Sequence, residues 1–474
     1  MSLRLEDTLT GETRPIEPVE PGHVRIYSCG PTVYGPAHVG NFRSFLFADV
    51  LVRYLRSQGQ RVTWVMNITD IDDKIIRGAA AEGLTTEALA DRWLARFRED
   101  AAALRMTPPD VLPRATQHID EMVRLIDQLL ERGHAYRTDD GSIFFRIASW
   151  PSYGRLARLD PEQLRVGERV EADEYGKDDV RDFAVWKGPK PGEPSWQTAI
   201  GPGRPGWHIE CSAMSMAHLG SPIDIHTGGI DLIFPHHEDE IAQSEAATGR
   251  PFVRTWLHCA HLRMGGAKMA KSIGNIARVT DVLATGVSPR VLRYVLIAVH
   301  YRKPLDYTDE SLAGAAGAIE RLDTAIAALR SYHEDRADDP ELPAVIAAAG
   351  AAFEAAMDED LNVSAALAAL FDLVRDLNRR VADRRLSSAD AERALAAIEA
   401  IDVVLAIGPD AAEAALDPDL VALLEARAAA RAARDWAASD RLRDELAGRG
   451  VLVEDTRDGQ RWRRAEPAPE SVGG

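Results

Sequence analysis

The chain has few cysteines and no long apolar run, and each of these absences excludes a class of protein. Three cysteines among 474 residues are too few, and odd in number, for a disulfide scaffold. No apolar run approaches the roughly 20 residues that span a bilayer, and the N-terminal MSLRLEDTLTGE lacks the apolar core of a signal peptide. The sequence therefore predicts a cytoplasmic protein without a membrane partner, whose cysteines are thiols, metal ligands or core residues.

The chain also lacks the positive charge of a general nucleic-acid-binding protein. Its formal net charge is -18, whereas binding to phosphates needs a positive surface. Residues 427–464 are an exception because Arg outnumbers Asp and Glu there. The sequence therefore allows a local basic surface near the C-terminus.

Strand and helix patterns indicate an α/β protein of several domains. Residues 23–110 begin as strand, Gly/Pro-rich loop, helix (42–58) and strand, which is typical of a parallel, doubly wound sheet. From about residue 310 the pattern changes to alanine-rich amphipathic helices. We expect a Rossmann-like parallel-sheet domain in two halves with an α+β insertion, then a helical bundle and a small mixed α/β domain. The predicted segments are 1–111, 112–206, 207–309, 310–407 and 408–474.

Two local patterns refine this outline. Ten of the nineteen residues in 188–206 are Gly or Pro, which predicts no regular element there. At the C-terminus, helices over 419–435 and 436–449 precede a predicted hairpin with its turn at Asp458-Gly459.

The segment FPHHEDEIAQSEAATG predicts a helix that starts after Pro235 and stops at Gly249. His236 and Glu240 are four residues apart and so share a face. A His and a carboxylate at this spacing suit two positions around a tetrahedral zinc.

Cysteines elsewhere in the chain are candidates for the other two zinc ligands. Cys211 in WHIECSAM and Cys29 at the end of the first long strand would supply thiolates. His237 with Glu240 fits almost as well as His236. The spacing by itself favours a solvated helix face without any metal.

Two loops have the composition of a phosphate site. GGAKMAKSIGN carries Lys268 and Lys271 three residues apart among small residues, which suits a developing polyphosphate charge; an exposed basic loop is the default alternative. Residues 35–41 lead from a strand end into a helix N-terminus, where open α/β sheets bind nucleotide phosphates. The sequence has neither the GxGxxG spacing nor the GKS of a P-loop at this point.

Taken in order, these segments resemble a known family. HVGN and KMAKS resemble the HIGH and KMSKS signatures of class I aminoacyl-tRNA synthetases, with Asn41 in place of the second His and Ala270 in place of the first Ser. The resemblance extends from LEDTLTGE to WRR. The motifs that are similar to those of cysteinyl-tRNA synthetases are YSCGPTVY, NITDIDDKI, GPGRPGWHIECSAM, HTGGIDLIFPHHEDEIAQSE, AMDEDLN and ARDWAASDRLRDEL.

The resemblance implies a zinc-dependent ligase of L-cysteine. It implies that zinc is held by Cys29, Cys211, His236 and Glu240, and so selects His236 over His237. Because a metal-bound thiolate separates cysteine from serine, no editing domain is expected. The residues expected around the amino acid are Cys29, Thr69, Trp207 and His226.

The resemblance also implies ATP with Mg²⁺ and a two-step reaction, in which cysteinyl-adenylate forms with release of pyrophosphate and is then transferred to the 3'-terminal adenosine of tRNA(Cys). Both departures from the signatures leave an active enzyme, since Asn41 still donates a hydrogen bond and both lysines remain. The expected catalytic residues are His38, Asn41, Lys268 and Lys271. The expected ATP contacts are His38, Gly40, Asn41, Gly228, Gly229, Asp231 and Lys271.

In the C-terminal domain, the resemblance implies that Arg431, Trp436 and Asp440 read anticodon bases. Each residue also has a simpler explanation, because an Arg on a helix is usually solvated and the Trp could be core. Cys259 is expected to be a core thiol. The roles of His208, His218, His258 and His261 stay open, and one or two of the last three are expected at the active-site wall.

Two other functions compete with this interpretation. A tRNA-independent cysteine ligase, which joins cysteine to an amino sugar, would share the metal and signature motifs but lack the C-terminal domain. A non-catalytic paralogue that binds zinc or tRNA would have lost Lys268, Lys271 or His38, which this chain retains. We expect a monomer.

Overall fold

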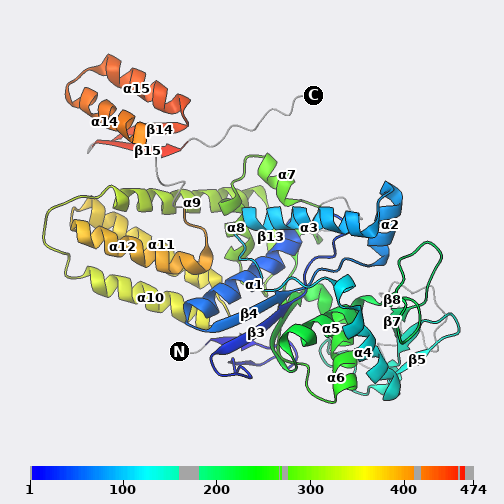
Figure 1. Cartoon of the computed structure of the whole chain (residues 1–474). Helices are drawn as coiled ribbons and strands as arrows, with labels where there is room; N and C mark the ends of the chain where they lie inside the picture. The colour runs from blue at the N-terminus through cyan, green and yellow to red at the C-terminus, as the bar shows by residue number, and fades with distance from the viewer. Residues whose placement is uncertain are drawn as a thin grey trace.

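A parallel four-stranded sheet forms the centre of the protein. Its strands have the order β10 (Val253–Cys259), β9 (Ile223–Gly229), β3 (His23–Ser28) and β4 (Arg61–Met66). Figure 1 labels β3 and β4 of this sheet. The computed structural model describes residues 3–159, 181–265, 267–268, 276–409, 418–456 and 459–464.

The two faces of this sheet belong to two different cores, because side chains alternate along a strand. From β3, Val24 and Ile26 enter one core and Tyr27 enters the other. The first core continues through α1 (Val39–Ser57) into the helical bundle, and the second lies under the inserted segment. The sheet therefore joins the two halves of the molecule.

Helix α1 follows β3 and carries the first signature loop at its N-terminus. The sequence predicted a helix over 42–58, but α1 begins at Val39 because His38 caps it. Helices α2 (Asp73–Glu82) and α3 (Thr86–Ala103) follow β4.

The inserted segment forms an antiparallel sheet beside helix α4 (Ile119–Glu131). The sequence predicted no regular element within 188–206, but the two-residue strand β8 (Arg204–Pro205) lies there. Glycines allow its backbone to approach the neighbouring strand closely, since a Cβ on Gly206 would lie 1.9 Å from the carbonyl oxygen of Ala184. The strands are β5 (Ala135–Arg137), β6 (Ile143–Phe145), β7 (Phe183–Lys187) and β8 (Arg204–Pro205).

Helices α5 (Trp207–Leu219) and α6 (Glu238–Thr248) pack on the same face of the central sheet as the insertion. The chain then leaves the sheet through a small three-stranded sheet in the order β12-β11-β13. Its strands are β11 (Leu262–Met264), β12 (Ala267–Lys268) and β13 (Leu305–Tyr307), and between them lie α7 (Val279–Ala284) and α8 (Pro289–Ala298).

Four long helices form the bundle beside α1 (Figure 1). They are α9 (Asp309–Arg330), α10 (Leu342–Asp358), α11 (Val363–Ala382) and α12 (Ser388–Leu405). None of the described helices is long and apolar enough to cross a bilayer.

The C-terminal unit has its own small core of Leu420, Leu424, Leu446 and Val451. Gly459 begins a strand opposite Thr456, and Asp458 of the predicted turn lies outside the described residues. Its elements are α14 (Pro418–Ala432), α15 (Trp436–Gly448), β14 (Val451–Thr456) and β15 (Gly459–Arg464).

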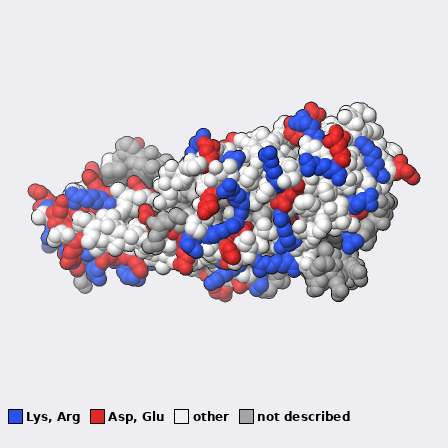
Figure 2. All heavy atoms as spheres, turned by 90° about the horizontal axis from the view of Figure 1, so that it is seen from below, with Lys and Arg blue, Asp and Glu red and all other residues white. Residues whose placement is uncertain are grey.

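The predicted fold class is confirmed: a parallel-sheet α/β domain with an α+β insertion, a helical bundle and a small mixed unit. The five predicted segment boundaries stay predictions. Acidic and basic side chains mix on the face in Figure 2, so the negative net charge does not gather in one area there.

Arg293 joins the sheet domain to the bundle. Its guanidinium is fully buried in α8 and donates to Asp49 of α1 (2.7 Å) and to the carbonyl oxygen of Leu405 (2.7 Å) at the end of α12. Without Arg293, buried Asp49 would keep only the partly exposed Arg53 as its ion-pair partner among the described residues, and the Leu405 carbonyl would lose this donor.

We expect Arg293→Met to lower the free energy of unfolding by about 3 kcal/mol, measured by urea denaturation. Arg375→Met is the matched control: this arginine pairs with Asp372 on α11 but is 76% exposed, so its loss should cost about 0.5 kcal/mol or less. Equal effects of the two changes would contradict a bracing role for Arg293.

Candidate metal centre and nucleotide site

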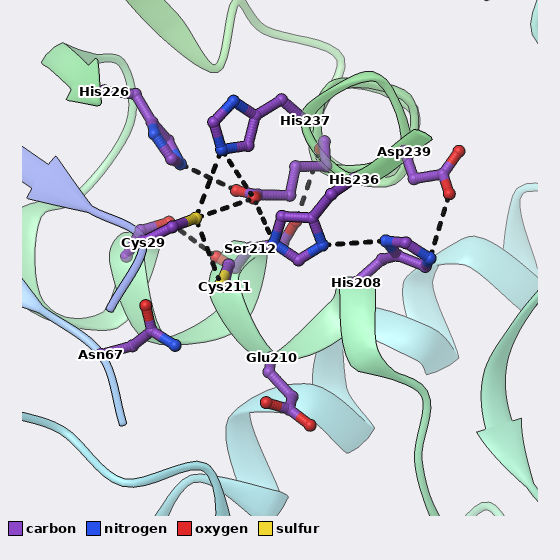
Figure 3. Close-up of polar contacts among 12 residues, drawn as sticks. Cys29, Asn67, His208, Glu210, Cys211, Ser212, His226, His236, His237 and Asp239 are labelled. Carbon is purple, nitrogen blue, oxygen red and sulfur yellow. Dashed lines mark hydrogen bonds and ion pairs between the residues drawn. The ribbon is translucent and has the colours of Figure 1, made fainter. Parts of the chain in front are cut away.

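Four buried side chains from distant parts of the sequence converge at the carboxyl end of β3 (Figure 3). Cys29 directly follows β3, where its amide donates to the carbonyl oxygen of Thr227 (3.1 Å). The other three are Cys211 of α5, His236 of the turn Ile233–His237, and Glu240 of α6.

The spacing of these atoms matches a tetrahedral site. Cys29 Sγ lies 3.8 Å from Cys211 Sγ and 3.7 Å from Glu240 Oε1, and His236 Nε2 lies 3.1 Å from the same Glu240 oxygen. Metal–sulfur bonds of about 2.3 Å at tetrahedral angles would separate two thiolates by about 3.8 Å. The residues present therefore fit a zinc-type ion, with two sulfurs, one nitrogen and one oxygen as donors.

The segment that carries His236 differs from its prediction. Helix α6 begins at Glu238, and both histidines lie in a wider π-type turn. The residue before a proline is pushed out of the helical region, and Phe234, before Pro235, has φ -137° and ψ 132°. The alternative of a solvated helix face is wrong, since His236 and Glu240 are buried.

A second donor set overlaps the first. Cys29 and Glu240 also lie within 4.8 Å of His226 and His237. His226 Nε2 contacts Glu240 Oε2 (2.9 Å), and His237 uses its Nδ1 for His258 (2.7 Å). The set with Cys211 fits a metal better because it contributes a second thiol.

Charges inside the cluster are strongly coupled. Burial opposes ionisation of Cys211, but hydrogen bonds from Cys29 and His236 lower its pKa to about 6. The pKa of Glu240 falls to about 2, against the effect of burial, because His226 and His236 lie beside it. Despite burial, the pKa of His236 rises to about 10 next to Cys211 and Glu240. These shifts favour the ionised forms of Cys211 and Glu240, and a bound cation would favour those forms further.

A second layer of polar residues holds the donors. His208 Nδ1 lies 3.0 Å from His236 Nδ1, its Nε2 lies 3.3 Å from Asp239, and Asp239 accepts a hydrogen bond from Tyr153 (2.5 Å). This series of polar contacts fixes the orientation of the His236 ring. The sequence assigns His208 no definite role and does not predict Asp239 or Tyr153 at this site. One signal in the sequence is the place of His208, one turn before Cys211 on α5.

The other open histidines lie at different places. His258 joins the cluster through His237, and its Nδ1 contacts the hydroxyl of Thr8 (2.8 Å). His218 pairs with His118 between α5 and α4 (2.9 Å), away from the cluster. His261 lies in the link between β10 and β11.

The residues expected around the amino acid lie beside the cluster but at different depths. The Trp207 ring stacks on His236 at 4.1 Å and is 39% exposed, so it forms an accessible wall. Thr69 is buried and its hydroxyl donates to Glu210 (2.9 Å). His226 is fully buried between Glu240 and Trp256, behind the donor atoms.

The first signature loop ends in a capping box. His38 Nδ1 accepts a hydrogen bond from the Asn41 amide (3.1 Å), and Asn41 Oδ1 accepts one from the His38 amide (3.1 Å). Asn41, the residue that departs from the family signature, therefore fixes the start of α1.

Three glycines of this region are enclosed by neighbouring atoms. A Cβ would lie 3.0 Å from His38 Nδ1 at Gly40, 2.6 Å from the His237 ring at Gly228, and 2.5 Å from Asp231 Oδ1 at Gly229. The buried His237 ring therefore leaves no room for a side chain at Gly228, whereas the Asp231 side chain beside Gly229 is exposed and can move. Lys268 is described only by its backbone in β12, and Lys271 lies outside the described residues.

The three expected anticodon contacts lie together in the C-terminal unit. The Arg431 guanidinium lies 5.7 Å from the centre of the Trp436 ring and donates to Asp455 (2.6 Å). Trp436 is 56% exposed, so the alternative of a core residue is wrong. Asp440, on the same helix as Trp436, pairs with Arg443 (3.2 Å).

Comparisons with known proteins agree with this architecture. Residues 15–317 match a family model described as the class I (C) tRNA synthetase catalytic domain, residues 352–407 match the DALR domain, and residues 413–463 match the cysteinyl-tRNA ligase anticodon binding domain. Among solved structures, methionyl-tRNA synthetase of Mycobacterium tuberculosis in complex with methionyl-adenylate has a TM-score of 0.59 at 18% identity, over 81% of this chain and 90% of that chain. This similarity shows the shared fold.

Curated relatives are closer in sequence. Cysteine–tRNA ligase of Alkalilimnicola ehrlichii is 48% identical over 98% of this chain and 100% of its own length, and that of Symbiobacterium thermophilum is 46% identical over the same shares. Relatives at this identity, matched over nearly the whole chain, show the family. The chain therefore belongs to the cysteinyl-tRNA synthetases, a family of class I aminoacyl-tRNA ligases.

Proposed function

We propose that this protein attaches L-cysteine to tRNA(Cys) in two ATP-dependent steps, and that it selects cysteine through a zinc ion. The observation that carries the proposal is the buried pair of thiols 3.8 Å apart, completed by His236 and Glu240. Membership of the family supplies the reaction class, and this donor set supplies the preference for a thiol.

Zinc in this site would supply a Lewis acid that takes the substrate sulfur as thiolate. The four donors Cys29, Cys211, His236 and Glu240 would hold it, and the second layer of His208 and Asp239 would keep the His236 ring in place. Trp207, stacked on His236, would close one side of the amino-acid site. Zinc binds a thiolate far more tightly than a serine hydroxyl. We therefore propose that the enzyme selects cysteine over serine without an editing step.

The nucleotide would lie at the N-terminus of α1. Backbone amides and the helix dipole favour phosphate there, and the His38–Asn41 capping box holds that end rigid. Gly40 lies in the first turn of that helix, and Gly228 and Gly229 at the end of β9, with Asp231 just after it, would face the adenosine. Lys268 and Lys271 would stabilise the departing pyrophosphate, with Mg²⁺ bound to ATP.

The C-terminal unit would hold the anticodon. The exposed Trp436 offers a stacking surface, and Arg431 and Asp440 offer a donor and an acceptor for base edges. The predicted division into catalytic halves 1–111 and 207–309, insertion 112–206, bundle 310–407 and anticodon domain 408–474 is part of this proposal, as are a monomeric state and a cytoplasmic location.

The metal assignment predicts a clear difference between two variants. Purified protein should contain one zinc per chain by mass spectrometry, and Cys211→Ser should lose it, because the thiolate is a direct ligand. His226→Gln, from the second donor set, should retain it. Cys259→Ser is the matched control, since this buried thiol lies outside both donor sets. Loss of zinc in His226→Gln with retention in Cys211→Ser would reverse the assignment.

The reaction itself is tested by ATP–pyrophosphate exchange. We expect exchange that depends on cysteine, with kcat/KM for serine lower by at least about 10⁴-fold, because the metal discriminates by bonding and not by size. Addition of tRNA(Cys) should give aminoacylation, whereas an amino-sugar acceptor should give none. Exchange with serine at a comparable rate, or transfer only to the amino sugar, would refute the proposal.

The anticodon role predicts a change confined to the second substrate. Trp436→Ala should raise KM for tRNA about tenfold, because one base–aromatic stack is worth about 1–3 kcal/mol, and should leave pyrophosphate exchange unchanged. Trp436→Phe keeps an aromatic face and should restore most of the affinity. Arg449→Gln, an exposed arginine of the same unit, should change neither. Equal KM values in all variants would remove Trp436 from the tRNA site.

A further inference from the structure

Arg43 has an unusual environment for a buried cation. It lies in α1, two residues after Asn41, and is 1% exposed. Its Nη1 donates to the carbonyl oxygens of Ala260 (2.7 Å) and His261 (2.7 Å), and its Nη2 donates to those of His300 (3.4 Å) and Lys303. None of these acceptors within the described part of the chain is a carboxylate, so the guanidinium serves to hold backbone.

The four carbonyls belong to two segments that both enter the small sheet. Residues 260–261 join β10 to β11, and residues 299–304 join α8 to β13. The segments also bond to each other: the Ala260 amide donates to the carbonyl of Tyr301 (2.7 Å), and the Leu305 amide donates to that of His261 (3.1 Å). Arg43 therefore connects α1 to the two segments that lead into the small sheet.

The small sheet carries part of the proposed pyrophosphate site, because β12 contains Lys268 and pairs with β11. The N-terminus of α1 touches the same region at three points. A Cβ on Gly40 would lie 3.8 Å from the Leu262 Cβ, the Val39 amide donates to the carbonyl of Ala277 (3.0 Å), and His38 pairs with Arg278 as an isolated bridge. The residues that make these contacts, Val39 and Gly40 with the cap His38, lie about one turn before Arg43 along α1.

We propose that Arg43 is a positioning residue for the nucleotide half of the reaction, which sets the distance between the His38–Asn41 end of α1 and the sheet that carries Lys268. This inference rests on the proposed function. A guanidinium is suited to the task because its planar fork reaches two pairs of carbonyls at once, which the single ammonium of a lysine cannot do. The metal cluster is held by other contacts, from α5, α6 and β9, so cysteine binding should be independent of Arg43.

Arg43→Lys tests the proposal because it keeps the charge and the aliphatic stem. We expect kcat/KM for ATP in cysteine-dependent exchange to fall about tenfold or more, since small misplacements of reacting groups have effects of this size. KM for cysteine and zinc content should stay at wild-type values. Arg53→Lys is the matched control: Arg53 lies on the same helix and also donates to backbone carbonyls, but those of Val403 and Arg105.

Equal losses toward ATP and cysteine would make Arg43 a merely structural brace and overturn the proposal, as would full activity of Arg43→Lys. If Arg43→Lys does not fold, Arg43→Gln, whose neutral amide can donate to fewer of these carbonyls and buries no charge, must show the selective loss, and wild-type behaviour there overturns the proposal.

Amide hydrogen exchange tests the brace without any activity measurement. In Arg43→Lys, amides of Leu262–Met264 and Leu305 should exchange faster than in the wild type, with β3 and β9 unchanged; unchanged protection of the small sheet would overturn the inference. Absence of cysteine-dependent exchange in the wild type would instead refute the proposed function, so the two failures are distinguishable.

Discussion

The contact between two buried thiols, a histidine and a carboxylate is the constraint on which the rest of this structure depends. Bringing such groups out of water is unfavourable unless they pair with one another or with a cation. Cys29, Cys211, His236 and Glu240 pair in this way, and the coupling is strong enough to lower the pKa of Cys211 to about 6. The residues around the cluster keep these atoms out of contact with water and hold them in position.

The cluster is held first by the elements that carry its donors and then by a second layer of polar residues. Cys29 directly follows β3, and His226 lies in the middle of β9. Cys211 comes from α5, His236 from the turn Ile233–His237, and Glu240 from α6. His208 and Asp239 then hold the ring of His236, and Tyr153 of the inserted segment holds Asp239. The insertion thus contributes to the centre through the second layer, although it supplies none of the four donors.

The proposed nucleotide half of the site is supported differently. There, hydrogen bonds between side chains and backbone predominate. They are the capping box of α1 and the hydrogen bonds from Arg43 to four backbone carbonyls. Arg293 plays a related part deeper in the molecule, where it joins Asp49 to the end of the bundle. Buried arginines suit such places because several N–H donors on one rigid plane satisfy several chain segments together. The proposed metal half and the proposed nucleotide half therefore rest on different sets of contacts.

Local sequence determined a large part of this protein. Alternating apolar residues specified β3 and β4, the run after His38 specified α1, and the spacing of His236 and Glu240 put both on one side of a turn. Such features depend on neighbours within a few residues, so a sequence displays them. The family motifs added the four donors as a set, which spacing alone left ambiguous between His236 and His237.

The tertiary structure decided which distant residues meet and how deeply each side chain is buried. Only the fold brings Cys29 within 3.8 Å of Cys211, buries His226 behind Glu240, exposes Trp436, and aims Arg43 at carbonyls more than 200 residues away. Sequence encodes the period of an element and its preferred caps; the depth and partner of a side chain depend on how separate elements pack, and that is a property of the whole folded chain.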